Sequence, residues 1–147
     1  MPIWFNPLLK LDDLENFALQ NIAEHLELKW AEVGTDHLIM SMPVTEKVRQ
    51  PYGLLHGGIS CVLAETIGSI ASALVIDPSR FNCVGLEINA NHVRAVRDGL
   101  VRATCRPLHL GRSTHVWDIR INNEDNKLVC ISRLTVAIVA ISNQNVT

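Results

Sequence analysis

A long, nearly uncharged stretch in the middle of the chain constrains the fold more than any other part of the sequence. It runs from Gln50 to Ile76, opens with a loop rich in proline and glycine, reaches His56 and then stays apolar up to Asp77. This pattern predicts a loop that leads into a long buried helix. Glu65 is the only carboxylate inside the helix. Burying a carboxylate is costly unless it has partners or a task, so Glu65 is the first candidate for a functional residue.

A helix of this length and polarity could also span a membrane. The central glutamate argues against that, because it costs roughly 2.5–3.5 kcal/mol on insertion scales. Gly68, Ser69 and Ser72 dilute the hydrophobicity, and no basic residues flank the helix. We therefore expect a core helix of a soluble domain and no membrane partner.

Length and charge limit the remaining classes. A chain of 147 residues with a net charge of −2 predicts one domain over residues 1–147, with tails at 1–10 and 142–147, and no nucleic-acid partner. Arginines are nevertheless concentrated between positions 94 and 112. They suit either a solvated strand edge or a site for a phosphate-bearing ligand. They are Arg94, Arg97, Arg102, Arg106 and Arg112.

The cysteines and the N-terminus predict a reducing location. The four cysteines form no CxxC pair, so we expect reduced core residues. The first residues lack the basic and apolar regions of a secretory signal, which makes a cytoplasmic location the expectation.

Periodicity predicts an α+β domain. Residues 12–26 have the spacing of a short amphipathic helix, and residues 27–33 and 37–44 flank a turn and predict a hairpin. After the long helix, four successive antiparallel strands are expected at 83–96, 100–110, 114–121 and 128–141. Trp117, Ile119 and Ile121 alternate with polar residues, as on a strand with one packed face. An antiparallel sheet of about six strands should therefore curl around the single long helix.

Several familiar chemistries do not fit the sequence. Ser60 lacks the second glycine of a nucleophile elbow. A pair of Cys61 and His56 would point roughly 140° apart on a helix. The six histidines show no metal-binding spacing, and no glycine-rich phosphate loop is present.

The start of the helix at His56-Gly57 and the carboxylate of Glu65 are the features left to explain. They are ~13.5 Å apart along a helix axis, too far to act on one small reactive centre within one chain. Two helices packed antiparallel about a two-fold axis would bring the start of one close to Glu65 of the other. Free N–H groups facing a carboxylate suit attack on an acyl carbonyl, and Ser69, one turn after Glu65, could bond the carboxylate or a water.

Several blocks of sequence carry a family resemblance. They are residues 50–58 (QPYGLLHGG), 64–69 (AETIGS), 85–94 (GLEINANHVR), 107–111 (PLHLG) and 132–135 (SRLT). In this order the chain resembles the hotdog-fold acyl-CoA thioesterases that act on aromatic thioesters such as hydroxybenzoyl-CoA and 1,4-dihydroxy-2-naphthoyl-CoA. The resemblance implies a hotdog fold, in which a curved antiparallel sheet wraps a long helix, and hydrolysis of an acyl-CoA to free acid and coenzyme A.

The resemblance also implies roles for individual residues. Glu65 matches the catalytic carboxylate, as base or as nucleophile, while Gln50 and the N–H of Gly57 match the groups that polarise the thioester carbonyl. His56 matches a residue that shapes this loop, and Ser69 matches a hydroxyl that contacts water or substrate. The predicted residues for the substrate and coenzyme A are His92, Arg94, Arg112, Ser113 and Thr114.

The family uses no metal or redox cofactor, since coenzyme A is part of the substrate. Its members form dimers with shared active sites, commonly assembled into tetramers as dimers of dimers, and the same is expected here. Three alternatives stay open at this point: a non-catalytic acyl-CoA-binding module, a proofreading thioesterase for aryl carrier-protein thioesters, and a hotdog hydratase or dehydratase. The acyl group itself cannot be predicted from one sequence.

Overall fold

The structure is a computed structural model that describes residues 1–15 and 19–142. The elements of this part of the chain are, in order, α1 (Leu11–Glu15), α2 (Ile22–His25), β1 (Lys29–Val33), β2 (Leu38–Pro43), the 3-10 helix η1 (Glu46–Val48), α3 (Gly57–Val75), β3 (Phe81–His92), β4 (Leu100–Leu110), β5 (Thr114–Asn122) and β6 (Leu128–Ala140).

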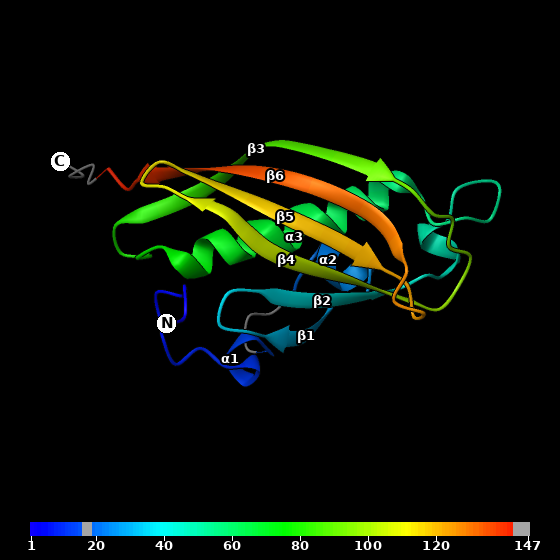
Figure 1. Cartoon of the computed structure of the whole chain (residues 1–147), viewed down its shortest axis with the longest axis horizontal. Coiled ribbons are helices and arrows are strands. Elements are labelled where there is room, and N and C mark those ends of the chain that lie inside the picture. Colours follow the sequence, from blue (N-terminus) through cyan, green and yellow to red (C-terminus); the bar gives the residue numbers. More distant parts are fainter. Residues whose placement is uncertain (16–18, 143–147) are drawn as a thin grey trace.

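The six strands form one antiparallel sheet in the order β1-β2-β4-β5-β6-β3. Helix α3 lies across one face of the sheet and contacts strands β2 to β6 (Figure 1). The predicted α+β class, the long central helix and the antiparallel sheet of six strands are confirmed. This is the arrangement that the hotdog resemblance implied.

The core lies between α3 and the inward face of the sheet. Trp117, Ile119 and Ile121 alternate along β5 as predicted, and all three are fully buried. They belong to the same buried cluster as Leu63 and Ile67 of α3. Close packing of these side chains sets the distance between the helix and the sheet.

Helix α3 is long and apolar enough to cross a membrane by length and composition alone. A core helix passes the same test, so the property is weak evidence for a membrane span. In the fold, the sheet covers the apolar side of α3, whose buried residues are Ser60, Leu63, Ala64, Ile67, Gly68, Ala71 and Ser72. The apolar sequence of α3 is thus explained by the domain core.

The position of β3 in the sheet differs from the prediction. The strands at 83–96 and 100–110 were expected to follow each other as antiparallel neighbours, but β3 pairs with β6 and β4 pairs with β2. The turn at Gly99 is present, with a left-handed φ of 78°. A turn signal shows where the chain reverses but does not show which strands become neighbours. Residues 93–99 can therefore cross from β3, at one edge of the sheet, to β4, which is not its neighbour.

The N-terminal region also departs from the prediction. The single helix expected over residues 12–26 is wrong, because α1 and α2 are separate short helices. Asn21 and Glu27, which bound α2, have φ values of 57° and 56° and cannot continue a right-handed helix. Phe17 and Ala18, part of the predicted helical pattern, lie outside the described residues.

Residues 3–5, within the predicted tail at 1–10, contact the domain. Trp4 is only 5% exposed, and its Nε1–H donates to the carbonyl of Gly34 at 2.8 Å. The N–H groups of Ile3 and Phe5 bond to the carbonyls of Thr35 and Leu74. Of the predicted C-terminal tail, residues 143–147 lie outside the described part of the chain.

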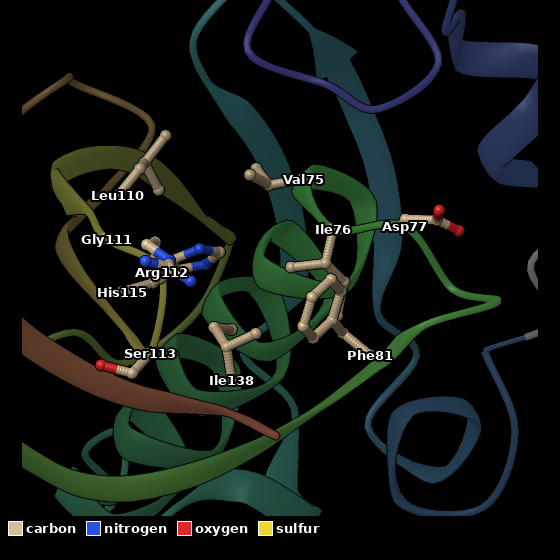
Figure 2. Close-up of a pocket in the computed structure, with 10 residues that line it drawn as sticks. All are labelled: Val75, Ile76, Asp77, Phe81, Leu110, Gly111, Arg112, Ser113, His115 and Ile138. Carbon is tan, nitrogen blue, oxygen red and sulfur yellow. The ribbon is translucent and has the colours of Figure 1, made fainter. Parts of the chain in front are cut away.

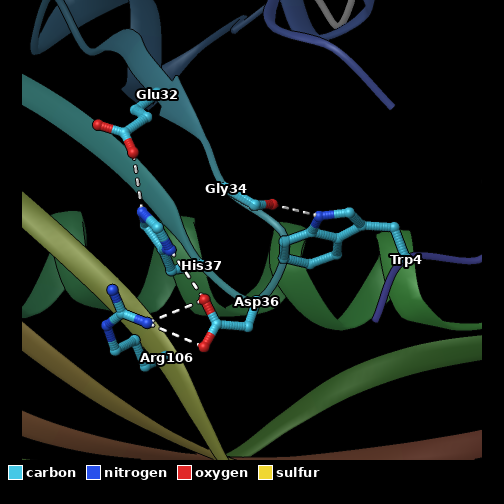
Figure 3. Close-up of polar contacts among 6 residues, drawn as sticks. All are labelled: Trp4, Glu32, Gly34, Asp36, His37 and Arg106. Atoms are coloured by element: carbon cyan, nitrogen blue, oxygen red, sulfur yellow. Dashed lines mark hydrogen bonds and ion pairs between the residues drawn. The ribbon is translucent and has the colours of Figure 1, made fainter. Parts of the chain in front are cut away.

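A polar cluster connects the β1–β2 hairpin to β4 (Figure 3). The two ring nitrogens of His37 lie 2.9 Å from carboxylate oxygens of Glu32 and Asp36, and Nη1 of Arg106 donates to both Asp36 oxygens at 2.9 Å. The hydrogen bond from His37 and the charge of Arg106 lower the pKa of Asp36. The Glu32, Asp36 and Arg106 side chains are about half exposed, so each pair stabilises the fold only modestly.

Candidate active site

His56 caps the N-terminus of α3. It has extended backbone angles, and its Nδ1 accepts a hydrogen bond from the N–H of Gly58 at 2.9 Å. A side-chain cap normally satisfies one of the free N–H groups of the first turn. Within residues 1–15 and 19–142, no group accepts a hydrogen bond from the N–H of Gly57. The hydrogen bond between His56 and Gly58 is consistent with the predicted role of His56 in shaping this loop. The N–H of Gly57 is available to a ligand.

A cavity of about 370 Å³ lies beside this helix terminus. Four of the residues predicted from the sequence meet there: Gln50, Gly57, His92 and Arg94. The rest of the lining is mostly apolar and consists of Leu54, Leu55, Ser60, Val93, Ala95 and Val129. The apolar lining residues could not be predicted from the sequence, since nothing in the local pattern distinguishes cavity lining from core.

A tight turn fixes Gln50. Its backbone N–H donates to the carbonyl of Leu54 at 2.8 Å, and its carbonyl accepts from Gly53 at 2.9 Å. Gly53 has a φ of 80°, which glycine adopts without strain. The side-chain Oε1 of Gln50 accepts from the N–H of Tyr52. The amide NH₂ of Gln50 is therefore the part left to donate to a ligand oxygen.

His92 lies directly over Gly57. A Cβ atom on Gly57 would be 2.8 Å from Nε2 of His92, closer than real Cβ atoms approach other atoms. His92 is the last residue of β3, so the edge strand of the sheet places its imidazole at the start of α3. The absence of a side chain at Gly57 allows this contact.

Glu65 lies two helical turns further along α3. Ser69 Oγ is 3.5 Å from Glu65 Oε1, the long limit of a hydrogen bond, so the predicted pairing is present but weak. Eight residues separate Gly57 from Glu65, which is about 12 Å along a helix axis. Glu65 does not line the cavity that holds Gln50 and Gly57. One chain therefore brings together the groups predicted to polarise the carbonyl and keeps the Glu65 carboxylate apart from them.

The predicted coenzyme A residues are divided between two places. Arg94 lines the cavity at the start of α3 and donates from Nε to the carbonyl of Leu128 at 3.2 Å. Arg112 and Ser113 line a second cavity of about 710 Å³ at the other end of α3. Figure 2 shows Arg112 on the opposite side of this cavity from Asp77 and Phe81. Thr114 does not line it; its carbonyl accepts from the N–H of Gly111 at 2.9 Å.

A buried polar network at the second cavity was not predicted from the sequence. Ser72 Oγ accepts a hydrogen bond from Nε1 of Trp117 at 2.7 Å and lies 3.2 Å from Nδ1 of His115. Tryptophan can only donate, so Ser72 Oγ is the acceptor in that bond, and the direction of the bond to the neutral His115 ring depends on which ring nitrogen carries the proton. Burial lowers the pKa of His115 and favours this neutral form. No local sequence pattern identifies these three residues, because only the fold brings α3 and β5 together.

The cysteines do not provide a nucleophile. All four are free, and burial raises the pKa of each thiol, with Cys130 raised to about 11. For Cys61, the position closest to the start of α3, this disfavours the thiolate needed for attack. The described residues contain no group of three or more His, Cys, Asp or Glu side chains arranged to hold a metal ion.

The fold and these groups define a class of enzyme. A long helix wrapped by an antiparallel sheet, with donors at the helix N-terminus and one carboxylate inside it, suits hydrolysis of an acyl group. Comparison with protein families identifies the thioesterase superfamily over residues 52–130.

Individual relatives agree with this family. The 1,4-dihydroxy-2-naphthoyl-CoA hydrolase of Escherichia coli is 48% identical over 88% of this chain and 95% of its own length. The proofreading thioesterase EntH of Cronobacter turicensis is 43% identical over 88% and 94% of the two chains. A solved mutant of thioesterase PA1618 from Pseudomonas aeruginosa has a TM-score of 0.90, is 46% identical and covers 95% of this chain and 99% of that one.

This chain therefore belongs to the thioesterase superfamily. It is a thioester hydrolase with the hotdog fold, as the resemblance implied.

Proposed function

We propose that this chain hydrolyses an aromatic acyl-CoA to the free acid and coenzyme A, and that 1,4-dihydroxy-2-naphthoyl-CoA is the first substrate to test. The relative of that name aligns with most of this chain, which supports an aromatic acyl group. The cavity beside α3 combines apolar walls with a few donors, the usual character of a small-molecule site.

One observation carries the proposed active site: the carbonyl-polarising groups and the carboxylate lie on one helix but at different places along it. Gln50 and the Gly57 N–H border one cavity, and Glu65 is about 12 Å further along α3. A second copy, with its α3 antiparallel to the first, would bring its Glu65 to that cavity. The active site is then formed by two chains and occurs twice in each dimer.

The edge of the sheet supports such a dimer. Strand β3 is at one end of the strand order, so its outer backbone groups have no neighbouring strand in the described part of the chain. Leu86 on this strand is 63% exposed. A long edge strand with apolar residues is suited to pairing with another chain. We propose an antiparallel pairing of two β3 strands and, by analogy with the family, assembly of two dimers into a tetramer.

The chemistry follows from these positions. The NH₂ of Gln50 and the N–H of Gly57 donate to the thioester oxygen and stabilise the oxyanion as the carbonyl carbon is attacked. Glu65 from the partner either removes a proton from the attacking water or attacks the carbon itself, forming an anhydride that water then hydrolyses. In both routes the C–S bond breaks, the coenzyme A thiolate leaves and takes up a proton, and the acid is released.

Coenzyme A would contact basic and hydroxyl groups at the surface. Arg94 is the first candidate because it lines the same cavity as Gln50. Arg112, Ser113 and Thr114 stay candidates for its phosphates, and they would have to act from a separate part of the surface. The proposal needs no metal or redox cofactor and places the enzyme in the cytoplasm.

Mixing of subunits tests the two-chain site. Glu65→Ala and Gln50→Ala should each lower thioesterase activity by at least ~10²-fold as homo-oligomers. A mixed dimer would contain one site with both lesions and one with neither, so activity should return to about half the wild-type rate per mixed dimer. Glu24→Ala, an exposed glutamate on α2, is the matched control and should stay fully active. Verified subunit exchange without recovery of activity would refute the two-chain site.

A second substrate class is favoured by one comparison. The similarity to the proofreading thioesterase EntH supports the alternative of a proofreading thioesterase, which we propose would act on an aryl group carried on a protein instead of on coenzyme A. Values of kcat/KM for the same aryl group on coenzyme A and on a carrier protein would decide between them. Stoichiometric binding of acyl-CoA without release of thiol would instead indicate a non-catalytic binding module.

A further inference from the structure

The carboxylate of Glu65 lies against the backbone of β3 at Gly85. A Cβ atom built on Gly85 would be 2.2 Å from Oε1 of Glu65 and 3.4 Å from its Cδ. Real Cβ atoms essentially never approach another atom within 3.0 Å. The space that any side chain at Gly85 would need is therefore occupied by the carboxylate.

The backbone at Gly85 does not itself require glycine. In the described chain, left-handed φ angles among glycines occur at Gly53 and Gly99, and Gly85 is not one of them. An alanine could adopt the backbone conformation of Gly85 without strain. The reason for a missing side chain at this position is thus the Glu65 carboxylate and not the course of the chain.

The sheet is irregular at the same point. Gly85 pairs with Val136 of β6 and Glu87 pairs with Thr135, so Leu86 is an extra residue in β3. Such a bulge bends a strand and changes where its neighbours point, and bulges are frequent next to active sites. The bend and the missing side chain together make a recess in β3 that faces α3.

Residues of α3 and β3 border the carboxylate in this recess. Oε1 of Glu65, the atom closest to Gly85, is also the atom that Ser69 Oγ approaches at 3.5 Å. Cys83, two residues before Gly85 and on the same face of β3, donates from Sγ to the carbonyl of Ser69 at 3.6 Å. Oε1 thus lies between α3 and β3. Oε2, 3.9 Å from the Cβ position on Gly85, is the oxygen left for chemistry.

We propose that Gly85 is a positioning residue for the reaction: the recess at Gly85 sets where the Glu65 carboxylate stands relative to the thioester carbonyl. The inference rests on the proposed catalytic role of Glu65. A methyl group at Gly85 would push Oε1 away by about 1.2 Å, from 2.2 Å to the 3.4 Å at which ordinary contact begins. A misplacement of about 1 Å can reduce a rate about 10²-fold.

The first test is the Gly85→Ala variant, assayed by thiol release from 4-hydroxybenzoyl-CoA. Its kcat should fall about 10²-fold, while KM changes by no more than about twofold because substrate-binding groups are untouched. Thermal unfolding and oligomeric state should match the wild type, since alanine suits a strand at least as well as glycine. Asn82→Ala, an exposed change on the same strand, is the control and should leave kcat unchanged.

Double variants separate positioning from a general disturbance of the fold. If Gly85 acts only through the carboxylate, Gly85→Ala should have no further effect on kcat in a Glu65→Ala background. Glu65→Asp shortens the side chain by about 1.5 Å, one carbon–carbon bond. In the Gly85→Ala background, Glu65→Asp should lower kcat no further, although Glu65→Asp alone lowers the kcat of the wild-type enzyme. Independent, multiplicative effects in both combinations would overturn the proposal.

The outcomes also distinguish this inference from the proposed function. Full activity of Glu65→Ala would refute the catalytic role of Glu65, and the role of Gly85 with it. Loss of activity in Glu65→Ala together with a wild-type kcat in Gly85→Ala would refute the positioning role alone.

Discussion

Removal of one buried hydroxyl, in the Ser72→Ala variant, should destabilise the domain strongly. Ser72 and Trp117 are fully buried and His115 is 3% exposed. Without the hydroxyl, the Trp117 N–H loses its 2.7 Å partner and Nδ1 of His115 loses its 3.2 Å partner. A buried polar group left without a partner costs about 1–3 kcal/mol. Two groups lose a partner and the better helix propensity of alanine returns about 0.5 kcal/mol, so the free energy of unfolding should fall by at least about 1.5 kcal/mol.

Ser132→Ala is a matched control. Ser132 is also only 3% exposed, but its Oγ has no hydrogen-bond partner among the described residues. Removing an unsatisfied hydroxyl strands no other group, so this variant should be neutral or slightly stabilised. Urea unfolding at one fixed protein concentration measures both changes, because oligomerisation makes apparent stability depend on concentration. An equal loss of stability in the two variants would refute the assigned network.

Three further predictions concern the site, the pH dependence and the N-terminus. Gly57→Ala should lower kcat/KM at least ~10-fold, because the added Cβ would displace His92. The same change should lower kcat/KM by a smaller factor in a His92→Ala background. Because the pKa of His115 is lowered in the folded chain, the unfolded chain binds the proton more readily. The stability contributed by neutral His115 is therefore present above about pH 6.5 and is lost as the pH falls through the lowered pKa. Urea titrations from pH 7 to 5 should show a shallower loss in His115→Gln. Trp4→Phe should reduce the free energy of unfolding by about 1 kcal/mol by removing the bond to Gly34, whereas no change would mean that the first residues contribute nothing.

The parts of the fold that could be predicted are those with a strong local pattern. Helix α3 was expected because a long apolar stretch lies between clear start and stop residues, and the alternation of Trp117, Ile119 and Ile121 identified the buried face of β5. The place of β3 beside β6 was missed because strand order depends on contacts between distant parts of the chain. The burial of Trp4 could not be predicted, because an isolated tryptophan near a terminus belongs to no hydrophobic periodicity.

In the candidate site, too, local groupings could be predicted from the sequence and contacts between distant residues could not. Residues near each other in the sequence, such as Gln50, His56 and Gly57, could be grouped from the loop and helix start alone. The contact of Glu65 with Gly85 could not, because it depends on the register and the bulge of a strand that follows α3. A single glycine in a strand signals a bulge or a close approach, without saying which atom approaches.

The pairing of β3 with β6 also determines when the domain can close as the chain is made. Phe81 at the start of β3 pairs with Ala140 at the end of β6, so β3 has no neighbouring strand until β6 has left the ribosome. At about 5–20 residues per second, the interval between completing β3 and completing β6 is roughly 2–10 s. During this time the side of α3 that β6 covers faces solvent. A nascent chain that stalls before Leu128 would expose this apolar surface and an unpaired strand together, and would be a target for chaperones and proteases.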